Sequence, residues 1–297
     1  MSDMKAWGGN CVDHKDGADI CLMGVPFDSA ASINKGAAMA PDNLRALSKF
    51  LPCVSEEGVD FEGFKIYDAG DVEPDLNWER FFGVVEDSAY DLFKTGSFCF
   101  FLGGDHSVTI PLQKAFKKQY PNEKIGVIHF DSHADICAEY EGHKWSHACT
   151  ARRAVEDVLG SPRDWAMVGI RSYEPQEIDY LKNHPVKLIK AYDLHKKGYE
   201  AACAELKEHF SGYDKIYLTL DIDVIDPSGA PGTGTPEAGG PTSREIIEMV
   251  KFLTANLPVA AMDIVEVSPP LDTRNQITSW AALKIMYEVF AIVKGRR

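Results

Sequence analysis

Residues 125–135 read IGVIHFDSHAD, a short apolar run followed at once by chemically active side chains. The first six residues have the length and composition of a buried β-strand. Asp131, His133 and Asp135 follow at alternate positions. In an extended segment alternate residues face the same way, so these three groups converge on one point. The stretch therefore predicts a strand whose end carries a set of metal-ligating side chains.

Similar apolar runs recur along the chain and alternate with amphipathic stretches. The expected strands are 20–25, 65–68, 97–102, 125–130, 165–170, 186–189, 216–220 and 259–265. Helical patterns cover 41–50, 78–94, 108–120, 147–159, 199–210, 243–255 and 277–293. Strands that are apolar on both faces and separated by helices are typical of a parallel sheet covered on both sides. Because no linker or repeat interrupts the pattern, it predicts an α/β fold in a single domain, residues 1–297.

The composition sets the class of protein. The chain has 297 residues, 45% of them hydrophobic and 26% charged, with a net charge of −14. These values exclude a disordered or fibrous chain, and the acidic balance argues against nucleic acid as a partner. Residues 1–16 lack the apolar segment of a secretory signal, and no apolar run reaches the ~18–20 residues of a membrane span. The seven scattered cysteines include no CxxC pair, so we expect a reduced, cytoplasmic compartment and no membrane partner.

Three further expected strands also run into polar clusters. GGDHS (103–107) follows strand 97–102, DID (221–223) follows strand 216–220, and strand 259–265 ends in DIVEV (263–267). Ligands of open parallel sheets gather at the carboxyl ends of the strands. The clusters together supply two imidazoles and four carboxylates, from His106, Asp131, His133, Asp135, Asp221 and Asp223. Without a metal these groups would repel one another strongly, so the set indicates a metal site.

The donor types narrow the choice of metal. Carboxylate oxygens and imidazole nitrogens without a thiolate suit Mn²⁺ and disfavour a structural zinc site. Six ligands are too many for one catalytic ion with an open position, but they suit a pair of ions about 3.5–4 Å apart that share carboxylates. Four carboxylates also balance the charge of two divalent cations. The pattern indicates a site that activates water for hydrolysis.

These motifs, in this order, resemble the ureohydrolase family of arginases and agmatinases. Further similarity lies in GVPFD (24–28), VGIR (168–171) and GTGTP (232–236), so the resemblance spans nearly the whole chain. It implies a three-layer α/β/α sandwich with an eight-stranded parallel sheet, assembled as a homotrimer or homohexamer. It also implies a binuclear manganese centre, with two Mn²⁺ per subunit, that hydrolyses a guanidino group to urea and an amine.

The resemblance assigns roles to individual residues. One metal would be held by His106, Asp131, Asp135 and Asp221. The other would be held by His133, Asp131, Asp221 and Asp223. Asp131 and Asp221 would bridge the two metals. Glu266 matches the carboxylate that pairs with the substrate guanidinium, Asp135 would carry a proton to the leaving amine, and His147 falls where the family places a proton-shuttle histidine.

The substrate depends on the loop 136–146, ICAEYEGHKWS. Arginases surround the amino-acid end of their substrate with an Asn/Ser-rich loop, whereas this one has one serine, no asparagine and two acids. Acids favour a substrate with a cationic tail, which points to agmatine, with putrescine as product and a role in polyamine biosynthesis. Glu139 and Glu174 are the candidate tail-binding residues, with Glu141 and Glu237 as further candidates.

Guanidinobutyrate, arginine and guanidine stay open as substrates. A guanidino acid would need a basic tail site, for which Lys35, Arg45 and Lys144 are available. Two departures from the family pattern also bear on the substrate: Ala40 replaces a usual glycine, and Ala148-Cys149 follows His147 where many agmatinases have Gly-Thr or Gly-Ser.

Three other functions compete with hydrolysis of a guanidine. A metallophosphoesterase would carry a Gly-Asn-His-Asp/Glu cluster, which GGDHS is not. A single-zinc deacetylase on a related fold would not use His106. A catalytically silent relative that binds guanidines or polyamines would have no need for six metal ligands.

Overall fold

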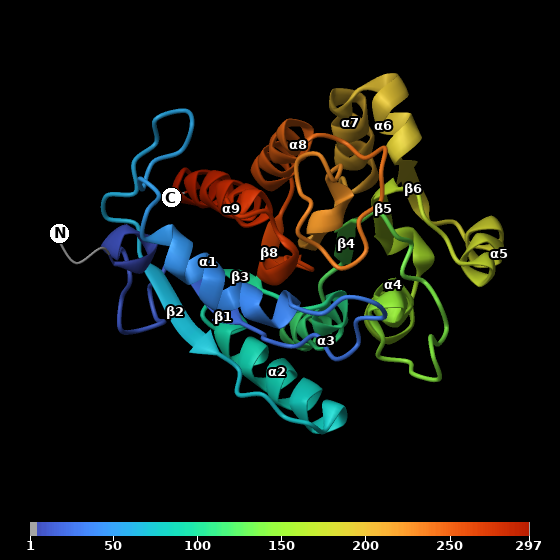
Figure 1. Ribbon diagram of the computed structural model, residues 1–297, viewed down its shortest axis with the longest axis horizontal. Coiled ribbons are helices and arrows are strands. Elements are labelled where there is room, and N and C mark those ends of the chain that lie inside the picture. Colours follow the sequence, from blue (N-terminus) through green and yellow to red (C-terminus); the bar gives the residue numbers. More distant parts are fainter. Residues whose placement is uncertain (1–4, 297) are drawn as a thin grey trace.

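The computed structural model describes residues 5–296, and within that range eight parallel strands form one sheet (Figure 1). The strand order is β2-β1-β3-β8-β7-β4-β5-β6. The bounds are β1 Ile20–Gly24, β2 Ile66–Asp71, β3 Phe98–Leu102, β4 Ile125–Phe130, β5 Trp165–Ile170, β6 Lys187–Lys190, β7 Lys215–Asp221 and β8 Val259–Val265. Every expected strand is present, and the eight-stranded parallel sheet is confirmed.

The helices lie between the strands. The α-helices are α1 Ala40–Ser48, α2 Trp78–Phe93, α3 Thr109–Gln119, α4 Thr150–Arg153, α5 Pro175–Asn183, α6 Ala191–Lys197, α7 Tyr199–His209, α8 Ser243–Asn256 and α9 Ile277–Lys294. The 3-10 helices are η1 Ala6–Gly9, η2 Ala37–Met39, η3 His106–Val108, η4 His147–Cys149, η6 Pro162–Asp164, η7 Ile222–Val224 and η8 Pro269–Leu271, and η5 Ala154–Leu159 is a π-helical turn.

Two helices, α5 and α6, were not among the helical patterns read from the sequence. Both are short: α5 buries only Glu177 and α6 only Ala191 and Leu194, so neither has the extended apolar stripe by which an amphipathic helix is recognised. The expected helix 147–159 is instead a 3-10 turn, a single α-turn and a π-turn in succession. By contrast, α8 begins where its sequence indicates, because Thr242 and Glu245 form a capping box.

The sheet is the middle layer of three. Alternate side chains of a strand enter opposite cores, as in β3, where Phe98, Phe100 and Leu102 face one side and Cys99 and Phe101 the other. Buried residues of α1, α6, α7, α8 and α9 complete the first core, and those of α2, α3 and α4 complete the second. The predicted three-layer α/β/α sandwich is therefore confirmed. No helix among the described residues is long and apolar enough to cross a membrane.

The strand order brings the polar strand ends together. The four strands that carry them, β3, β8, β7 and β4, are consecutive in the sheet. The loop after β3 also lies tightly against the loop after β1, because Gly104 lets the two backbones meet. A Cβ on Gly104 would lie 1.7 Å from the carbonyl oxygen of Phe27. The Asp105 backbone N–H donates to that same oxygen at 2.7 Å, so the loop that carries His106 is fixed in place.

Candidate metal centre

His106 lies at the centre of a buried group of carboxylates. Its Nδ1 is 3.0 Å from Asp131 Oδ2, 3.3 Å from Asp135 Oδ2 and 3.3 Å from Asp221 Oδ2. Only 1% of the histidine is exposed. Its backbone is held by the turn of η3, where the carboxylate of Asp105 accepts from the Ser107 N–H at 3.0 Å. The structure thus brings together all four residues that the resemblance assigns to one metal.

His133 forms a second group beside the first. Its Nδ1 is 3.0 Å from Asp223 Oδ2 and 3.5 Å from Asp131 Oδ1. Asp131 therefore faces His106 with one oxygen and His133 with the other. Asp223 is placed by the tight turn after β7, where Asp221 Oδ1 accepts from the Asp223 N–H at 2.8 Å. The pattern Asp-x-Asp after a strand thus aims two carboxylates at neighbouring groups.

Two atoms of these groups lack a hydrogen bond. His106 Nδ1 and Asp223 Oδ2 are buried and have no hydrogen-bond partner among the described residues. A buried polar atom without a partner is costly, and a bound metal ion is one of its ordinary explanations. The residues that could hold metal include His106, Asp131 and Asp135 in one group, and Asp131, His133 and Asp223 in the other. A buried His/Asp cluster of this kind fits a metal site.

The pKa values of the buried carboxylates are shifted in opposite directions. Burial and the neighbouring charge of Asp131 raise the pKa of Asp135 to about 7. Burial, with the charges of Asp223 and Asp131, also raises the pKa of Asp221 well above its usual range. Although burial opposes it, the neighbouring imidazoles of His106, His129 and His133 hold the pKa of Asp131 well below its usual range. Divalent cations would remove the repulsion that these shifts express.

Glu266 and Asp135 both have left-handed backbone conformations. The φ angles are +60° for Glu266 and +50° for Asp135, and residues with a Cβ seldom adopt this region. Strain of this kind gathers at functional sites, where neighbouring contacts enforce it. For Glu266 the contacts are two: its N–H donates to Gly104 O at 2.8 Å, and its Oε1 accepts from the His106 N–H at 2.9 Å. The carboxylate predicted to bind the guanidinium thus lies against the metal group.

His147 begins η4 and has a defined orientation. Its Nδ1 lies 2.6 Å from the carbonyl oxygen of Ala30, so Nδ1–H donates and Nε2 is left for other partners. Ala30 is itself held, because its N–H donates to Asp105 Oδ2 at 2.9 Å. Burial lowers the pKa of His147. A neutral imidazole with one fixed nitrogen can accept and release protons at the other.

A cavity of about 420 Å³ opens onto both groups. Its walls include His133, Asp135 and His147 together with three glutamates, Glu174, Glu177 and Glu237. The remaining lining residues are Ser32, Ile33, Asn34, Tyr140, Ala148, Ser172, Tyr173, Gly234, Thr235 and Pro236. Of the described residues, no lysine or arginine belongs to this lining.

The other candidate tail residues lie elsewhere. Glu139 is exposed and is not part of the cavity lining, so the structure does not bring it to the site. Lys35 and Lys144 are exposed and also lie outside the lining. Arg45 is already paired, with its Nε 2.9 Å from Asp68 and its Nη1 2.5 Å from Asp71.

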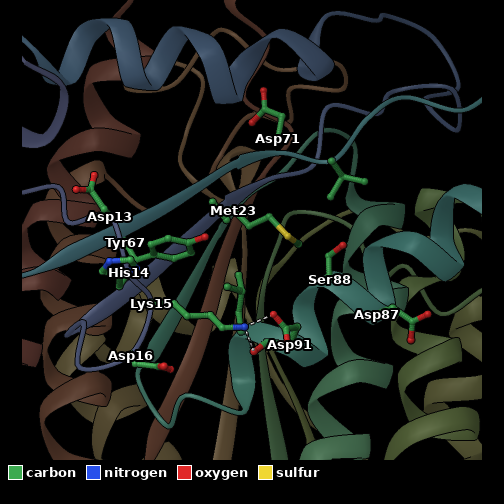
Figure 2. A pocket seen from close by; sticks show the side chains of 13 residues that line it. Asp13, His14, Lys15, Asp16, Met23, Tyr67, Asp71, Asp87, Ser88 and Asp91 are labelled. Carbon is green, nitrogen blue, oxygen red and sulfur yellow. Dashed lines mark hydrogen bonds and ion pairs between the residues drawn. The ribbon is translucent and has the colours of Figure 1, made fainter.

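A second cavity, of about 690 Å³, lies apart from the metal centre beside β1, β2 and α2 (Figure 2). Figure 2 shows the side chain of Lys15 pointing toward Asp91, with which it forms an ion pair. None of the site residues predicted from the sequence belongs to its lining. Because its acids are exposed or paired, this cavity does not compete with the metal centre as the functional site.

His129 is a site residue that the sequence reasoning missed. It is fully buried in β4, its Nε2 lies 2.8 Å from Asp131 Oδ2, and its ring stacks on His106 with centroids 4.7 Å apart. A signal was available: His129 is the only polar side chain of an otherwise apolar strand and lies two residues before Asp131, on the same face.

Comparisons with known proteins agree with this geometry. The family model described as the arginase family matches residues 18–291. The chain is 33% identical to the guanidinobutyrase of Pseudomonas aeruginosa, over 94% of this chain and 88% of that protein. It is 35% identical to an agmatinase of Bacillus anthracis, over 92% of this chain and 91% of that protein. The crystal structure of agmatine ureohydrolase of Thermoplasma volcanium superposes with a TM-score of 0.87 at 29% identity, covering 99% of this chain and 95% of that one.

Proposed function

Because the chain belongs to the arginase family of hydrolases that act on amidino C–N bonds, we propose that it is a binuclear manganese enzyme that cleaves agmatine to putrescine and urea. The observation that carries the choice of substrate is the acid-lined cavity, free of lysine and arginine among the described residues, which opens onto the two histidine–carboxylate groups. Putrescine as the product would place the reaction in polyamine formation. The homo-oligomer, the single domain and the cytoplasmic location stay predictions.

The residues present fit a pair of manganese ions. Nδ1 of His106 and Oδ2 of Asp223 are unpartnered buried atoms, and the donor set of oxygen and imidazole nitrogen suits Mn²⁺. The ligands proposed for one position are His106, Asp131, Asp135 and Asp221. Those for the other are His133, Asp131, Asp221 and Asp223. When bound, such a pair supplies Lewis acidity that lowers the pKa of water and so provides the nucleophile at neutral pH.

The protein's own residues would then bind and orient the substrate. Glu266 holds a carboxylate at the edge of the metal group, where it can accept hydrogen bonds from guanidinium N–H groups. Gly234 lies beside its second oxygen: a Cβ there would lie 3.8 Å from Glu266 Oε2. Asp135 lines both the metal group and the cavity, so its carboxylate can take a proton and pass it to the leaving nitrogen. His147 borders the same cavity and can exchange that proton with solvent.

The tail of the substrate would meet the glutamates. Glu177 is buried and already accepts from the N–H groups of Ile136 and Glu174, both at 2.8 Å. The carboxylates of Glu174 and Glu237 are therefore the ones left to face a primary ammonium. The tail carboxylate of a guanidino acid would meet like charge instead. Guanidinobutyrate is the second candidate, since a guanidinobutyrase is among the similar proteins.

A panel of guanidines tests the substrate. After loading with Mn²⁺, we expect urea release from agmatine to show a kcat/KM at least about tenfold above that for guanidinobutyrate, arginine and guanidine, because each tenfold needs only 1.4 kcal/mol of preference. An aryl phosphate serves as the control for a phosphoesterase and should not be cleaved. Equal or faster turnover of guanidinobutyrate would contradict the choice of agmatine, and no urea from any guanidine would contradict hydrolysis.

Charge removal in the cavity tests the tail site. Glu237→Gln and Glu174→Gln should each raise KM for agmatine about 1.4- to fivefold, the equivalent of the ~0.2–1 kcal/mol typical of an exposed ion pair. Neither should change KM for guanidine, which has no tail. Glu139→Gln is the matched control, because Glu139 is an exposed acid of the same region outside the lining. An effect on agmatine only in the Glu139 variant would place the tail elsewhere.

A further inference from the structure

A row of polar residues crosses three neighbouring strands directly beneath the metal group. His129 of β4 is in register with Thr219 of β7, and Thr219 is in register with Asp263 of β8. All three are 0% exposed. On this face of the sheet the row adjoins the apolar core, which includes Val127, Ala261 and Val265. Buried polar groups lower the stability of the fold unless each is hydrogen-bonded, so a fully buried polar row indicates a functional role.

Asp263 is held by hydroxyl groups alone. Its Oδ1 accepts from Thr219 Oγ1 at 2.6 Å, and its Oδ2 accepts from Tyr217 OH at 2.8 Å and from Thr109 Oγ1 at 2.9 Å. Burial raises the pKa of this carboxyl, and the nearby His106 acts against that rise. No lysine or arginine forms an ion pair with Asp263 in the described part of the chain. Asp263 is therefore connected to the metal group instead, through the Thr219 hydroxyl that lies between it and His106.

The hydrogen-bond acceptors around Thr219 determine where the Thr219 hydroxyl proton and the His106 ring proton lie. A threonine hydroxyl has one proton, and the Thr219 hydroxyl gives it to Asp263, since an ionised carboxylate can only accept. Thr219 Oγ1 also lies 2.9 Å from His106 Nε2, toward which it can only accept. His106 therefore carries its proton on Nε2. Its Nδ1, which faces three carboxylate oxygens, is left with a lone pair.

We propose that Thr219 and Asp263 are positioning residues that fix the His106 tautomer and thereby strengthen metal binding at the His106 position. The inference rests on the proposed metal centre. A histidine that ligates a metal generally donates its other ring N–H to a neighbour, and loss of that neighbour lowers metal affinity 10- to 100-fold. Here the neighbour is a hydroxyl that is itself polarised by a buried carboxylate.

The hydrogen bonds that run from Asp263 through Thr219 to His106 form a relay. Four substitutions separate the effect of this relay from that of general packing. Thr219→Val removes the relay at nearly constant volume, and Thr219→Ser restores the hydroxyl. In Asp263→Asn the amide can donate to Thr219, which turns the threonine proton toward His106 Nε2 and favours the wrong tautomer. Tyr217→Phe is the matched control, because it removes one donor to Asp263 but leaves the path from Asp263 to His106 intact.

The measurement is calorimetric titration of Mn²⁺ into the metal-free full-length protein, with a melting curve of each variant to establish folding. We expect two sites in the wild type, one of them weakened 10- to 100-fold in Thr219→Val and in Asp263→Asn. Thr219→Ser and Tyr217→Phe should stay within about threefold of the wild type. Adding Asp263→Asn to Thr219→Val should weaken binding little further, since the relay is already broken.

The outcomes are distinguishable. Wild-type protein that binds no Mn²⁺ would overturn the proposed metal centre itself. A wild type with two sites and unchanged affinities in folded Thr219→Val would overturn only the relay. If Thr219→Val does not fold, Asp263→Asn and Thr219→Ser decide: equal affinity in both overturns the relay, whereas weakening confined to Asp263→Asn supports it.

Discussion

Replacing Glu266 by glutamine is expected to lower kcat/KM for agmatine by about 10²- to 10³-fold while both manganese sites keep wild-type affinity. The carboxylate of Glu266 would meet the guanidinium as an anion with two acceptor oxygens, and such charge-assisted pairs are the strong ones in proteins. Glutamine keeps one acceptor, which can hold the His106 N–H at 2.9 Å, so the local backbone should persist. Loss of a single preorganised electrostatic contact to the reacting group typically has this size of effect.

Two measurements on the same protein check this result. Urea release gives kcat and KM for agmatine, and titration of Mn²⁺ gives the number and affinity of metal sites. Glu237→Gln is the matched control, because it removes an acid from the same neighbourhood and should change only KM, and only for substrates with a cationic tail. Turnover within threefold of the wild type in Glu266→Gln would remove Glu266 from the catalytic machinery.

The parts of the fold that follow from short stretches of sequence were predictable. β4, β5 and β8 have the bounds expected from their apolar runs, because burial on both faces leaves a continuous run that local composition reveals. The convergence of His106, Asp131 and Asp221 was predictable for a similar reason. Each lies at the end of a parallel strand, and all such ends meet at one edge of the sheet.

What the sequence could not supply depends on the register between strands and on loop paths. The row of His129, Thr219 and Asp263 exists only because β4, β7 and β8 pair in one particular alignment, and no local pattern records that alignment. The sequence favoured Glu139 over Glu237 as a tail-binding residue, yet loop geometry leaves Glu139 exposed and brings Glu237 to the cavity. Loops are where local propensity says least about position.

Replacing Asp221 by asparagine is expected to lower urea release at least about 10³-fold and to remove tight manganese binding. Asp221 Oδ2 lies 3.3 Å from His106 Nδ1, and Asp221 would be a ligand at both proposed metal positions. An amide lacks the charge that balances a divalent cation. Asparagine can still accept the Asp223 N–H with its side-chain oxygen, so the turn after β7 should keep its shape. The comparison variant His133→Ala should have the same effect on activity through the second group.

The same substitution should act on stability with the opposite sign. In metal-free protein the buried charges of Asp223 and Asp131 disfavour ionised Asp221, so Asp221→Asn removes a repulsion. We therefore expect metal-free Asp221→Asn to melt at or above the temperature of metal-free wild type. Added Mn²⁺ should raise the melting temperature of the wild type but leave that of the variant nearly unchanged, because only a ligand that binds the folded state stabilises it. If chelation leaves the wild type's melting temperature unchanged while the variant keeps its activity, Asp221 holds no metal, and its repulsion with Asp131 and Asp223 needs another counter-charge.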